Sequence, residues 1–303
     1  MSPDVYGFAG PIIVTGANGF IGRHLCSRLA AAGEEVHAVV RSHSTRVVTQ
    51  PPGVVVHSLR DSTAEYASVA DAVQPAVVFH LATFFAPRHQ PSEIARMVEA
   101  NVTFGASVAD ATARSGARLV HTTSAWQHYG GADYSPVSLY AATKQALCDL
   151  IQHFTESEGL VAQEVCLFDT YGPRDDRKKL MSLMLDHAAS GEALPMSSGR
   201  QLVDLTHVDD VVGALLQVAS GHPLGARLVA RGGKPLTIRG LATLVERVTG
   251  RSIDARWGVR PARPREMEED WIISGAATPW RPQIDLATGV ARLWDARTSA
   301  RLT

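Results

Sequence analysis

The stretch from Ile12 to Gly22 constrains the fold of this chain more than any other. Its apolar residues run without interruption into a turn that carries Gly16, Gly19 and Gly22. Such a run is typical of a parallel strand that is covered on both faces. Gly16 permits a tight turn, Gly19 lets backbone N–H groups approach a pyrophosphate, and Gly22 lets the following helix pack closely on its strand. Three glycines alone are a weak signal, but a strand before them and a helical pattern after them predict a dinucleotide site at a helix N-terminus.

After this turn, short apolar runs alternate with helical patterns. The further predicted strands cover residues 35–40, 54–57, 76–80, 119–123, 161–168 and 227–230, and residues 202–206 are extended. The predicted helices cover residues 63–73, 92–114, 138–157, 177–190, 207–219, 236–249 and 286–294. The aspartates at 209 and 210 are interpreted as N-terminal caps of their helix.

This alternation predicts an α/β fold, a Rossmann-type doubly wound parallel sheet with a smaller C-terminal substrate-binding lobe. Residues 1–168 are expected to form the dinucleotide-binding domain, and residues 207–231 are expected to return to it. Residues 171–303 would mainly form the substrate-binding lobe.

The composition excludes several other classes of protein. The 303 residues carry a net charge of −1, so no overall charge favours nucleic acid or an anionic membrane. The three cysteines, Cys26, Cys148 and Cys166, lack metal-ligand spacing and form no even disulfide framework, so we expect reduced, buried thiols and no metal site. The N-terminus lacks a signal pattern and no apolar run reaches membrane-spanning length, which predicts a soluble, cytoplasmic protein.

Tyr140 and Lys144 form the clearest chemical motif of the chain. They lie four positions apart, so they share one face of a predicted helix. A tyrosine with its ordinary pKa of about 10 transfers protons slowly at neutral pH, and an adjacent ammonium stabilises its phenolate. Ser124, at the end of a predicted strand, is placed to donate a hydrogen bond to the same substrate oxygen. The three residues predict acid–base catalysis at a carbonyl or hydroxyl group.

Together, the GxxGxxG turn and the segment Tyr140-Ala141-Ala142-Thr143-Lys144 resemble the extended short-chain dehydrogenase/reductase family, from about residue 11 to about residue 297. That family includes sugar-nucleotide epimerases, dehydratases and ketoreductases. The resemblance implies that Tyr140 is the acid/base, that Lys144 also binds the nicotinamide ribose, and that Ser124 orients the reacting oxygen. It also implies a homodimer paired through helices 92–114 and 138–157. The matching cofactor-binding positions are Gly16, Asn18, Gly19, Phe20, Ile21, Gly22, Leu81, Ala82, Tyr140 and Lys144.

The end of the second predicted strand bears on the choice of cofactor. A Rossmann site that prefers NAD usually places an acidic residue about 20 positions after the glycines, on the ribose 2′-OH. Here the strand ends in Arg41 and Ser42 with no acid nearby. A guanidinium suits a 2′-phosphate because it stays charged and forms paired hydrogen bonds, although a solvated surface arginine is the other interpretation. NADP(H) is therefore favoured, with NAD(H) as the alternative. Asp61 matches a family contact to adenine and serves equally well as a helix N-cap.

The sequence of the loop after the fifth strand does not decide which residue is the catalytic Ser/Thr. In many relatives four positions separate the catalytic Ser/Thr from a Tyr-Gly pair, whereas Ser124 and Tyr129 are five apart. Counting from the strand favours Ser124, counting back from Tyr129 lands on Ala125, and Thr123 is a further candidate. The extra residue would alter the pocket, with Trp126 and His128 as substrate-facing groups or as loop packing.

Three reaction classes within the resemblance remain to be distinguished. Dehydratases of the family carry an acid and a base immediately after the Ser/Thr, and this chain has Ala125 and Trp126 there, which disfavours elimination. An epimerase with retained NAD and an NADPH-dependent ketoreductase use the same Ser/Tyr/Lys set. Arg41 favours the reductase, and the segments 126–129 and 168–175 resemble reductases of 4-keto-6-deoxy sugars of the CDP-abequose synthase type. A non-catalytic NAD(P)-binding or sensor protein is a further alternative.

The predicted substrate is a nucleotide-linked sugar or another small carbonyl compound. Three departures from the family pattern bear on its binding: Cys166 and Val203 replace arginines, and Asp169 replaces an asparagine. A carboxylate cannot donate the hydrogen bonds of an amide, so contacts to a diphosphate are expected to differ. The candidate substrate-binding residues are Thr83, Phe84, Trp126, His128, Asp169, Arg174 and Arg265.

Overall fold

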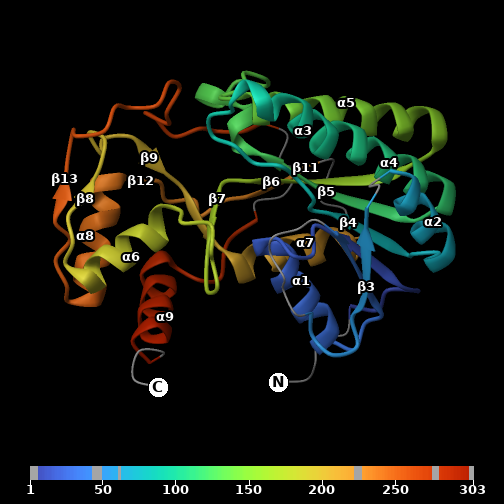
Figure 1. The fold of residues 1–303 in the computed structure, drawn as a ribbon, viewed down its shortest axis with the longest axis horizontal. Coiled ribbons are helices and arrows are strands. Elements are labelled where there is room, and N and C mark those ends of the chain that lie inside the picture. The colour runs from blue at the N-terminus through green and yellow to red at the C-terminus, as the bar shows by residue number, and fades with distance from the viewer. Residues whose placement is uncertain (1–5, 43–49, 61–62, 222–226, 275–279, 300–303) are drawn as a thin grey trace.

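A computed structural model describes residues 6–42, 50–60, 63–221, 227–274 and 280–299, which form a large sheet flanked by helices and a smaller lobe beside it (Figure 1). The sheet has seven strands in the order β11-β6-β5-β4-β1-β2-β3. All neighbouring strands in it are parallel. Its strands are β1 (Ile12–Thr15), β2 (Val36–Arg41), β3 (Val55–Leu59), β4 (Val77–His80), β5 (Arg118–Ser124), β6 (Val161–Leu167) and β11 (Arg227–Ala230).

Helices cover both faces of this sheet. On one face, α1 (Phe20–Ala31) and α7 (Val208–Ala219) bury side chains such as Leu25 and Leu215 against the strands. On the other face, α2 (Ala64–Val73), α4 (Phe104–Ser115) and α5 (Leu139–Glu158) bury a second core that includes Tyr66 and Leu147. Because strands buried on both faces need apolar residues throughout, β1 and β4 are buried along their whole length. The predicted doubly wound Rossmann-type sheet is confirmed.

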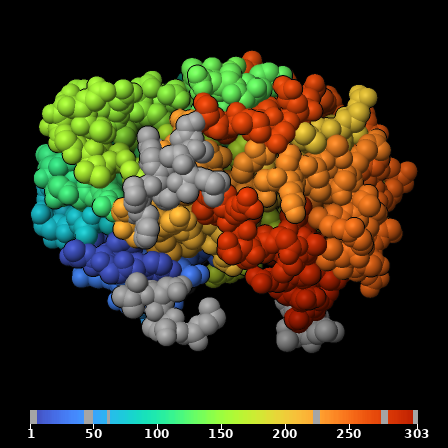
Figure 2. All heavy atoms as spheres, turned by 180° about the vertical axis from the view of Figure 1, so that it is seen from behind, coloured from blue at the N-terminus to red at the C-terminus, as the bar shows by residue number. Residues whose placement is uncertain are grey.

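The smaller lobe has its own apolar core, which includes Met184, Leu241 and Val290. Figure 2 shows its orange-to-red residues gathered on one side of the molecule, beside the blue-to-green half. Its helices are α6 (Leu180–Ser190), α8 (Ile238–Thr249) and α9 (Leu286–Ser299). Its short strands are β7 (Asp169–Tyr171), β8 (Leu194–Pro195), β9 (Leu202–Val203), β10 (Leu205–His207), β12 (Leu236–Thr237) and β13 (Ala255–Arg256).

The helix predicted over residues 92–114 is interrupted. A 3₁₀ turn at Pro91–Glu93 leads into α3 (Ile94–Val98), a π-helical turn at Glu99–Thr103 follows, and α4 begins only at Phe104. The π turn places Asn101 in the interior, where its amide meets four partners. Its Oδ1 accepts from Phe84 N at 2.6 Å and from Thr83 Oγ1 at 3.0 Å, and its Nδ2 donates to Phe84 O at 3.1 Å and to Thr143 Oγ1 at 2.9 Å. π turns of this kind occur frequently at functional sites.

The interpretation of Asp209 and Asp210 as helix caps was wrong. The side chain of His207 caps α7, because its Nδ1 accepts from Asp209 N at 3.2 Å. Asp210 is buried and instead accepts from the backbone N–H groups of Gln283 and Ile284, at 3.0 Å each. This carboxylate therefore attaches the segment before α9 to the Rossmann side of the molecule.

The glycine turn allows a close approach of backbone to backbone. Gly16 has a φ of +69°, and a Cβ there would lie 2.7 Å from Ala82 N. A Cβ on Gly22 would lie 2.3 Å from Gly16 O, since α1 begins directly over the turn. Both positions are thus restricted to glycine by the close contact of β1, α1 and the loop after β4.

We predict that Gly22→Ala destabilises the protein by about 1–3 kcal/mol and abolishes dinucleotide binding, because the new methyl group meets backbone that cannot move away. Thermal unfolding and a fluorescence titration with NADPH measure the two effects. Gly213→Ala in α7 is the matched control, since a Cβ at that position has no heavy atom within 4 Å. It should stabilise the helix by about 0.5–1 kcal/mol. Equal behaviour of the two variants would contradict the assignment.

Candidate active site

A cavity of about 670 Å³ lies at the carboxyl ends of the central strands. Strand order reverses between β1 and β4 there, and open α/β sheets bind ligands at such a point. Most of the predicted site residues line this cavity. They are Gly16, Asn18, Gly19, Phe20, Ile21, Gly22, Arg41, Leu81, Ala82, Thr83, Phe84, Ser124, Trp126, Tyr140 and Asp169.

The other predicted residues do not line the cavity. Ser42 is exposed directly after Arg41, and Lys144 is buried behind Tyr140 on α5. Asp61 lies outside the described residues. The remaining three, His128, Arg174 and Arg265, belong to loops outside the cavity lining.

The glycine turn fits a dinucleotide. Gly19 is the N-cap of α1 and has no side-chain cap, and no acidic residue occupies the first turn of the helix. A Cβ on Gly19 would lie 2.9 Å from Gly16 O, so the turn has no space for a larger residue. Unpaired N–H groups and the positive end of the helix dipole are thus available to a pyrophosphate.

Tyr140 forms part of the cavity wall, in the first turn of α5, where Ser138 caps the helix. Burial raises the pKa of Tyr140 to about 12, and a hydrogen bond with the Thr83 side chain opposes that shift. From the sequence we expected the neighbouring ammonium to dominate and to favour the phenolate. Burial dominates instead, so Tyr140 is a protonated phenol at neutral pH and suited to donate a proton.

Lys144 is 3% exposed. Burial lowers the pKa of its ammonium to about 8, while Cys148 and Glu164 oppose that shift. The carboxylate of Glu164 is already paired with another residue, since it forms a 2.7 Å ion pair with Arg227. Within the described ranges, no carboxylate forms an ion pair with Lys144. Its positive charge is thus held in the interior close to the tyrosine at a cost in stability.

Ser124 caps the 3₁₀ turn Ala125–Gln127, and its Oγ accepts from Trp126 N at 3.2 Å. Its own O–H is then left to donate into the cavity that it lines. The hydroxyl of Thr123 donates to Glu164 Oε1 at 2.5 Å, and Ala125 has no polar side chain. The geometry therefore favours Ser124 among the three candidates.

A second 3₁₀ turn, Tyr129–Gly131, follows in the same loop. His128, between the two turns, is 1% exposed. Its Nδ1 lies 2.8 Å from Asp133 O and 3.1 Å from Ala132 O, so this nitrogen is assigned the proton and donates to backbone. In this arrangement His128 holds the loop.

An aromatic cluster borders the cavity around Tyr140. The ring of Phe85 meets Tyr140 edge-to-face at 4.9 Å and lies 5.5 Å from Trp126. Phe85 is 40% exposed, and the ammonium of Lys179 lies 4.9 Å from its ring centre. A substrate placed at Tyr140 would thus meet an apolar wall on one side and a cation beside it.

Two cations that sequence reasoning missed, Arg177 and Lys179, line the cavity. Both Nε and Nη2 of Arg177 donate to the carboxylate of Asp175 at 2.7 Å, and its guanidinium covers the ring of Phe20 at 4.1 Å. Lys179 forms a 3.2 Å ion pair with Asp169. The cluster of aspartates and basic residues between 169 and 179 was the signal available in the sequence. It presents positive charge along one side of the cavity.

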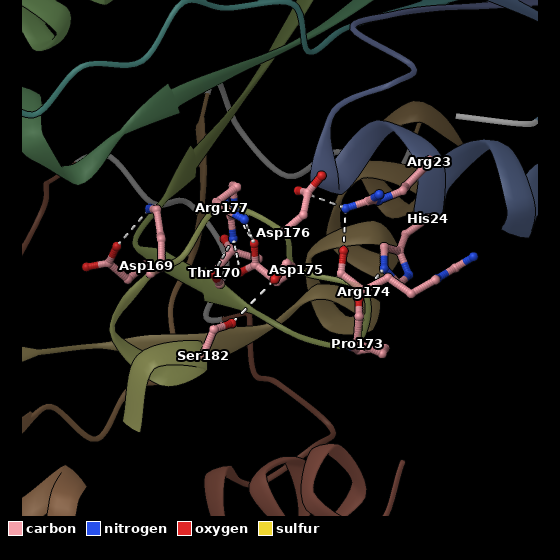
Figure 3. Close-up of polar contacts among 11 residues, drawn as sticks. Arg23, His24, Asp169, Thr170, Pro173, Arg174, Asp175, Asp176, Arg177 and Ser182 are labelled. Carbon is pink, nitrogen blue, oxygen red and sulfur yellow. Dashed lines mark hydrogen bonds and ion pairs between the residues drawn. The ribbon is translucent and has the colours of Figure 1, made fainter. Parts of the chain in front are cut away.

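The loop that carries these cations is attached to α1 (Figure 3). Arg23 donates to the carbonyl of Arg174 and forms a 3.2 Å ion pair with Asp176. His24 Nε2 lies 3.0 Å from the carbonyl of Pro173. Arg174 is exposed and contributes its backbone to this contact, with a φ of +59°.

Arg265 lies at a different loop. Its guanidinium covers the ring of Tyr129 at 4.2 Å and donates to Ser135 Oγ.

No group of three or more His, Cys, Asp or Glu in the described ranges could hold a metal ion. Burial raises the pKa of each cysteine thiol to about 12, so all three stay protonated at neutral pH.

We predict that Lys144→Met stabilises the cofactor-free protein at pH 7 by an amount on the order of 1–3 kcal/mol, because it removes a buried charge, and that it abolishes turnover. The wild type should recover stability relative to the variant as the pH rises from about 8. Over that range the folded state has released a proton that the unfolded state still binds. Denaturant unfolding at several pH values measures this difference. The exposed Lys234→Met is the control, and a destabilised Lys144→Met protein would contradict the prediction.

Three comparisons relate this site to known proteins. The family model described as "NAD dependent epimerase/dehydratase family" matches residues 12–225. UDP-glucose 4-epimerase of Mycolicibacterium smegmatis is 26% identical over 308 residues, covering 92% of this chain and 96% of the relative. A CDP-abequose synthase of Salmonella typhimurium is 25% identical over 215 residues, covering 68% of this chain and 69% of the relative. The solved structure "MoeE5 in complex with UDP-glucose and NAD" has 27% identity and a TM-score of 0.81, covering 97% of this chain and 100% of that one.

In the part of the chain that the structure describes, no helix has the length and apolar character needed to cross a membrane.

The family match covers most of the Rossmann side, including the glycine turn, Ser124, Tyr140 and Lys144. The resemblance predicted from those motifs is thereby confirmed. The chain belongs to the NAD dependent epimerase/dehydratase family and is an NAD(P)-dependent enzyme of the oxidoreductase type.

Proposed function

We propose that the protein reduces the keto group, at C4, of a nucleotide-linked 4-keto-6-deoxy sugar and consumes NADPH. The observation that carries this proposal is that Ser124 and a protonated Tyr140 line the same cavity as the glycine turn. This arrangement brings a proton donor to a carbonyl group that lies against the cofactor.

When bound, NADPH would supply the hydride that the carbonyl carbon gains in the proposed reaction. Tyr140 donates its phenolic proton to the carbonyl oxygen, so the ketone gains one hydride and one proton and becomes an alcohol. The Ser124 hydroxyl holds the same oxygen by a hydrogen bond. The ammonium of Lys144 stabilises the phenolate that Tyr140 becomes, until solvent returns the proton.

The walls of the cavity support a 6-deoxy sugar. Phe85 and Trp126 present apolar rings next to Tyr140, where a C6 methyl group can be buried and a hydroxymethyl or carboxylate would lose water contacts. Ala125 and Trp126 carry no acid or base for elimination across C5 and C6. The similarity to a CDP-abequose synthase agrees with this substrate class.

The charged side of the cavity supports a nucleotide diphosphate as the carrier of the sugar. Lys179 lies beside Phe85, close to the aromatic wall at Tyr140, and Arg177 lies over Phe20. Their aspartate partners hold both side chains in place, which reduces the entropy lost when an anion binds. Asp169 thus acts through Lys179, whereas an asparagine at that position would bind substrate itself. Arg174 and Arg265 are weaker candidates because neither lines the cavity.

An NAD-dependent sugar-nucleotide epimerase with retained cofactor is the second candidate. The similarity to UDP-glucose 4-epimerase and to MoeE5, which binds UDP-glucose and NAD, favours it. The two candidates differ in whether the cofactor is consumed. A non-catalytic sensor agrees less well with the structure, because both Tyr140 and Lys144 are present and buried at the site.

We predict that Tyr140→Phe lowers the turnover of a 4-keto-6-deoxy sugar nucleotide by about 10²–10⁴-fold and leaves NADPH binding within a factor of about three. The loss of NADPH absorbance measures turnover, and a fluorescence titration measures binding. Tyr134→Phe, at a side chain that is 50% exposed, serves as the control. Normal turnover by Tyr140→Phe would exclude the mechanism. Wild-type protein that retains NAD and interconverts epimers without consuming NADPH would establish the epimerase.

We predict that Lys179→Met raises the KM for the sugar nucleotide by about tenfold or more, with a smaller change in kcat, because a charge-assisted contact to diphosphate is lost. Steady-state kinetics at saturating NADPH measure this. The neighbouring exposed Lys178→Met is the matched control. A fall in kcat with unchanged KM would instead place Lys179 in the chemical step.

A further inference from the structure

A row of polar side chains crosses the large sheet at one level, on five neighbouring strands. On β1, β4, β5, β6 and β11, the residues paired in register are Thr15, His80, His121, Glu164 and Arg227. Partners on adjacent parallel strands lie about 5 Å apart and point to the same face of the sheet. At one end of the row, Thr15 Oγ1 lies 2.9 Å from His80 Nδ1. At the other end, Arg227 Nε donates to Glu164 Oε1 at 2.7 Å. The two histidines form the middle of the row.

This row lies on the sheet face that α5 covers. Leu119 and His121 are two positions apart on β5, so they share a face, and Leu119 packs in the same core as Leu147 of α5. Lys144 lies one turn before Leu147 on the buried side of that helix. Because α5 connects two parallel strands, it runs antiparallel to β5, and its first turns lie over the carboxyl end of that strand. Lys144 is therefore placed over His121 and its neighbours in the row.

Two ring nitrogens in this region have no hydrogen-bond partner among the described residues, Nε2 of His80 and Nδ1 of His121. The two residues are only 1% and 4% exposed. Thr15 Oγ1 accepts from Ala82 N at 3.3 Å, so its own O–H is left to donate to Nδ1 of His80. We therefore assign the proton of His80 to Nε2. A buried ring nitrogen without a partner costs free energy, which favours a small polar ligand at this place.

The charges around the two rings keep them neutral at pH 7. Burial lowers the pKa of His121 to about 4, and it lowers the pKa of His80 well below its ordinary value. The positive charge of Lys144 lowers both further. Glu164 opposes the shift at His121, but its Oε1 already accepts from Thr123 and Arg227. The titratable and charged side chains in this region are Tyr140, Lys144 and Cys148 on α5, His80 on β4, His121 on β5, Glu164 and Cys166 on β6, and Arg227 on β11.

We propose that His80 and His121 are positioning residues that bind one buried water molecule against the ammonium of Lys144. The water accepts from His80 Nε2 and from Lys144 Nζ, and it donates to His121 Nδ1. Three hydrogen bonds are the usual number for a buried water. They replace part of the hydration that the ammonium loses in the interior, and so keep it charged beside Tyr140. This inference rests on the role of Lys144 in the proposed function and adds two residues that act through it.

The test follows the ionisation of Lys144 without cofactor or sugar nucleotide. Denaturant unfolding at several pH values compares each protein with its own Lys144→Met derivative, and the pH at which their difference changes reports when folded Lys144 loses its proton. His80→Leu and His121→Leu remove the partners of the water. His80→Gln and His121→Asn keep a polar atom near Nε2 and Nδ1. His37→Leu, at a buried histidine of β2 that contacts His57, controls for the loss of a buried imidazole.

We expect this midpoint near pH 8 in the wild type. It should fall by about one pH unit or more in both leucine variants, because an ammonium without the water releases its proton more readily. The two amide variants and His37→Leu should stay within about 0.5 pH unit of the wild type. Unchanged midpoints in the leucine variants, or equal shifts in the leucine and amide variants, would overturn the proposal.

A second measurement does not depend on the stability of any variant. A high-resolution crystal structure of the wild type should show an ordered water within about 3.2 Å of His80 Nε2, His121 Nδ1 and Lys144 Nζ. A structure with no water at this place would exclude the proposal.

The outcomes also separate this inference from the proposed function. If the water is present and the leucine variants shift the midpoint, but no 4-keto sugar nucleotide is reduced, the positioning role stands and the proposed reaction fails. If the sugar nucleotide is reduced with NADPH, but the water is missing and the midpoints are unchanged, the reaction stands and the positioning role fails.

Discussion

The close approach of three backbone segments at the glycine turn is the constraint on which the rest of the molecule depends. Gly22 places the first turn of α1 directly over Gly16, and Gly16 in turn lies against the backbone of Ala82. This contact joins the first strand, the first helix and the loop after β4. It fixes where the helix N–H groups meet the cavity that Tyr140 also lines. A side chain at any of these contacts would displace a bound dinucleotide relative to Tyr140.

Much of this arrangement was readable from the sequence. The glycine spacing from Gly16 to Gly22 is typical of one backbone geometry, a tight turn between a strand and a helix. The spacing of Tyr140 and Lys144 places them on one face of a helix. Apolar runs in strands such as β1 and β4 identify buried parallel strands because both of their faces are covered. Local chemistry and local geometry agree at these positions, so little information from distant residues is needed.

The remaining features depend on contacts between distant parts of the chain. The break before α4 follows from a side chain, Asn101, whose four partners belong to another loop and another helix. The cations at 177 and 179 enter the cavity because Arg23 and His24 hold their loop to α1. The raised pKa of Tyr140 comes from its burial, which the spacing to Lys144 does not reveal. Periodicity and motifs cannot report such long-range partners.

Asn101 has a consequence for how this site can diverge during evolution. It holds the loop of Phe84 through main-chain atoms, and the same amide binds Thr143 on α5, the helix that carries Tyr140. The backbone of Phe84 is therefore held by contacts that do not involve its own side chain, and Phe85 follows it directly in the chain. Mutations at these two positions can reshape the wall of the pocket while Tyr140 stays in place. One buried amide thus separates changes in the pocket wall from the preservation of the geometry around Tyr140.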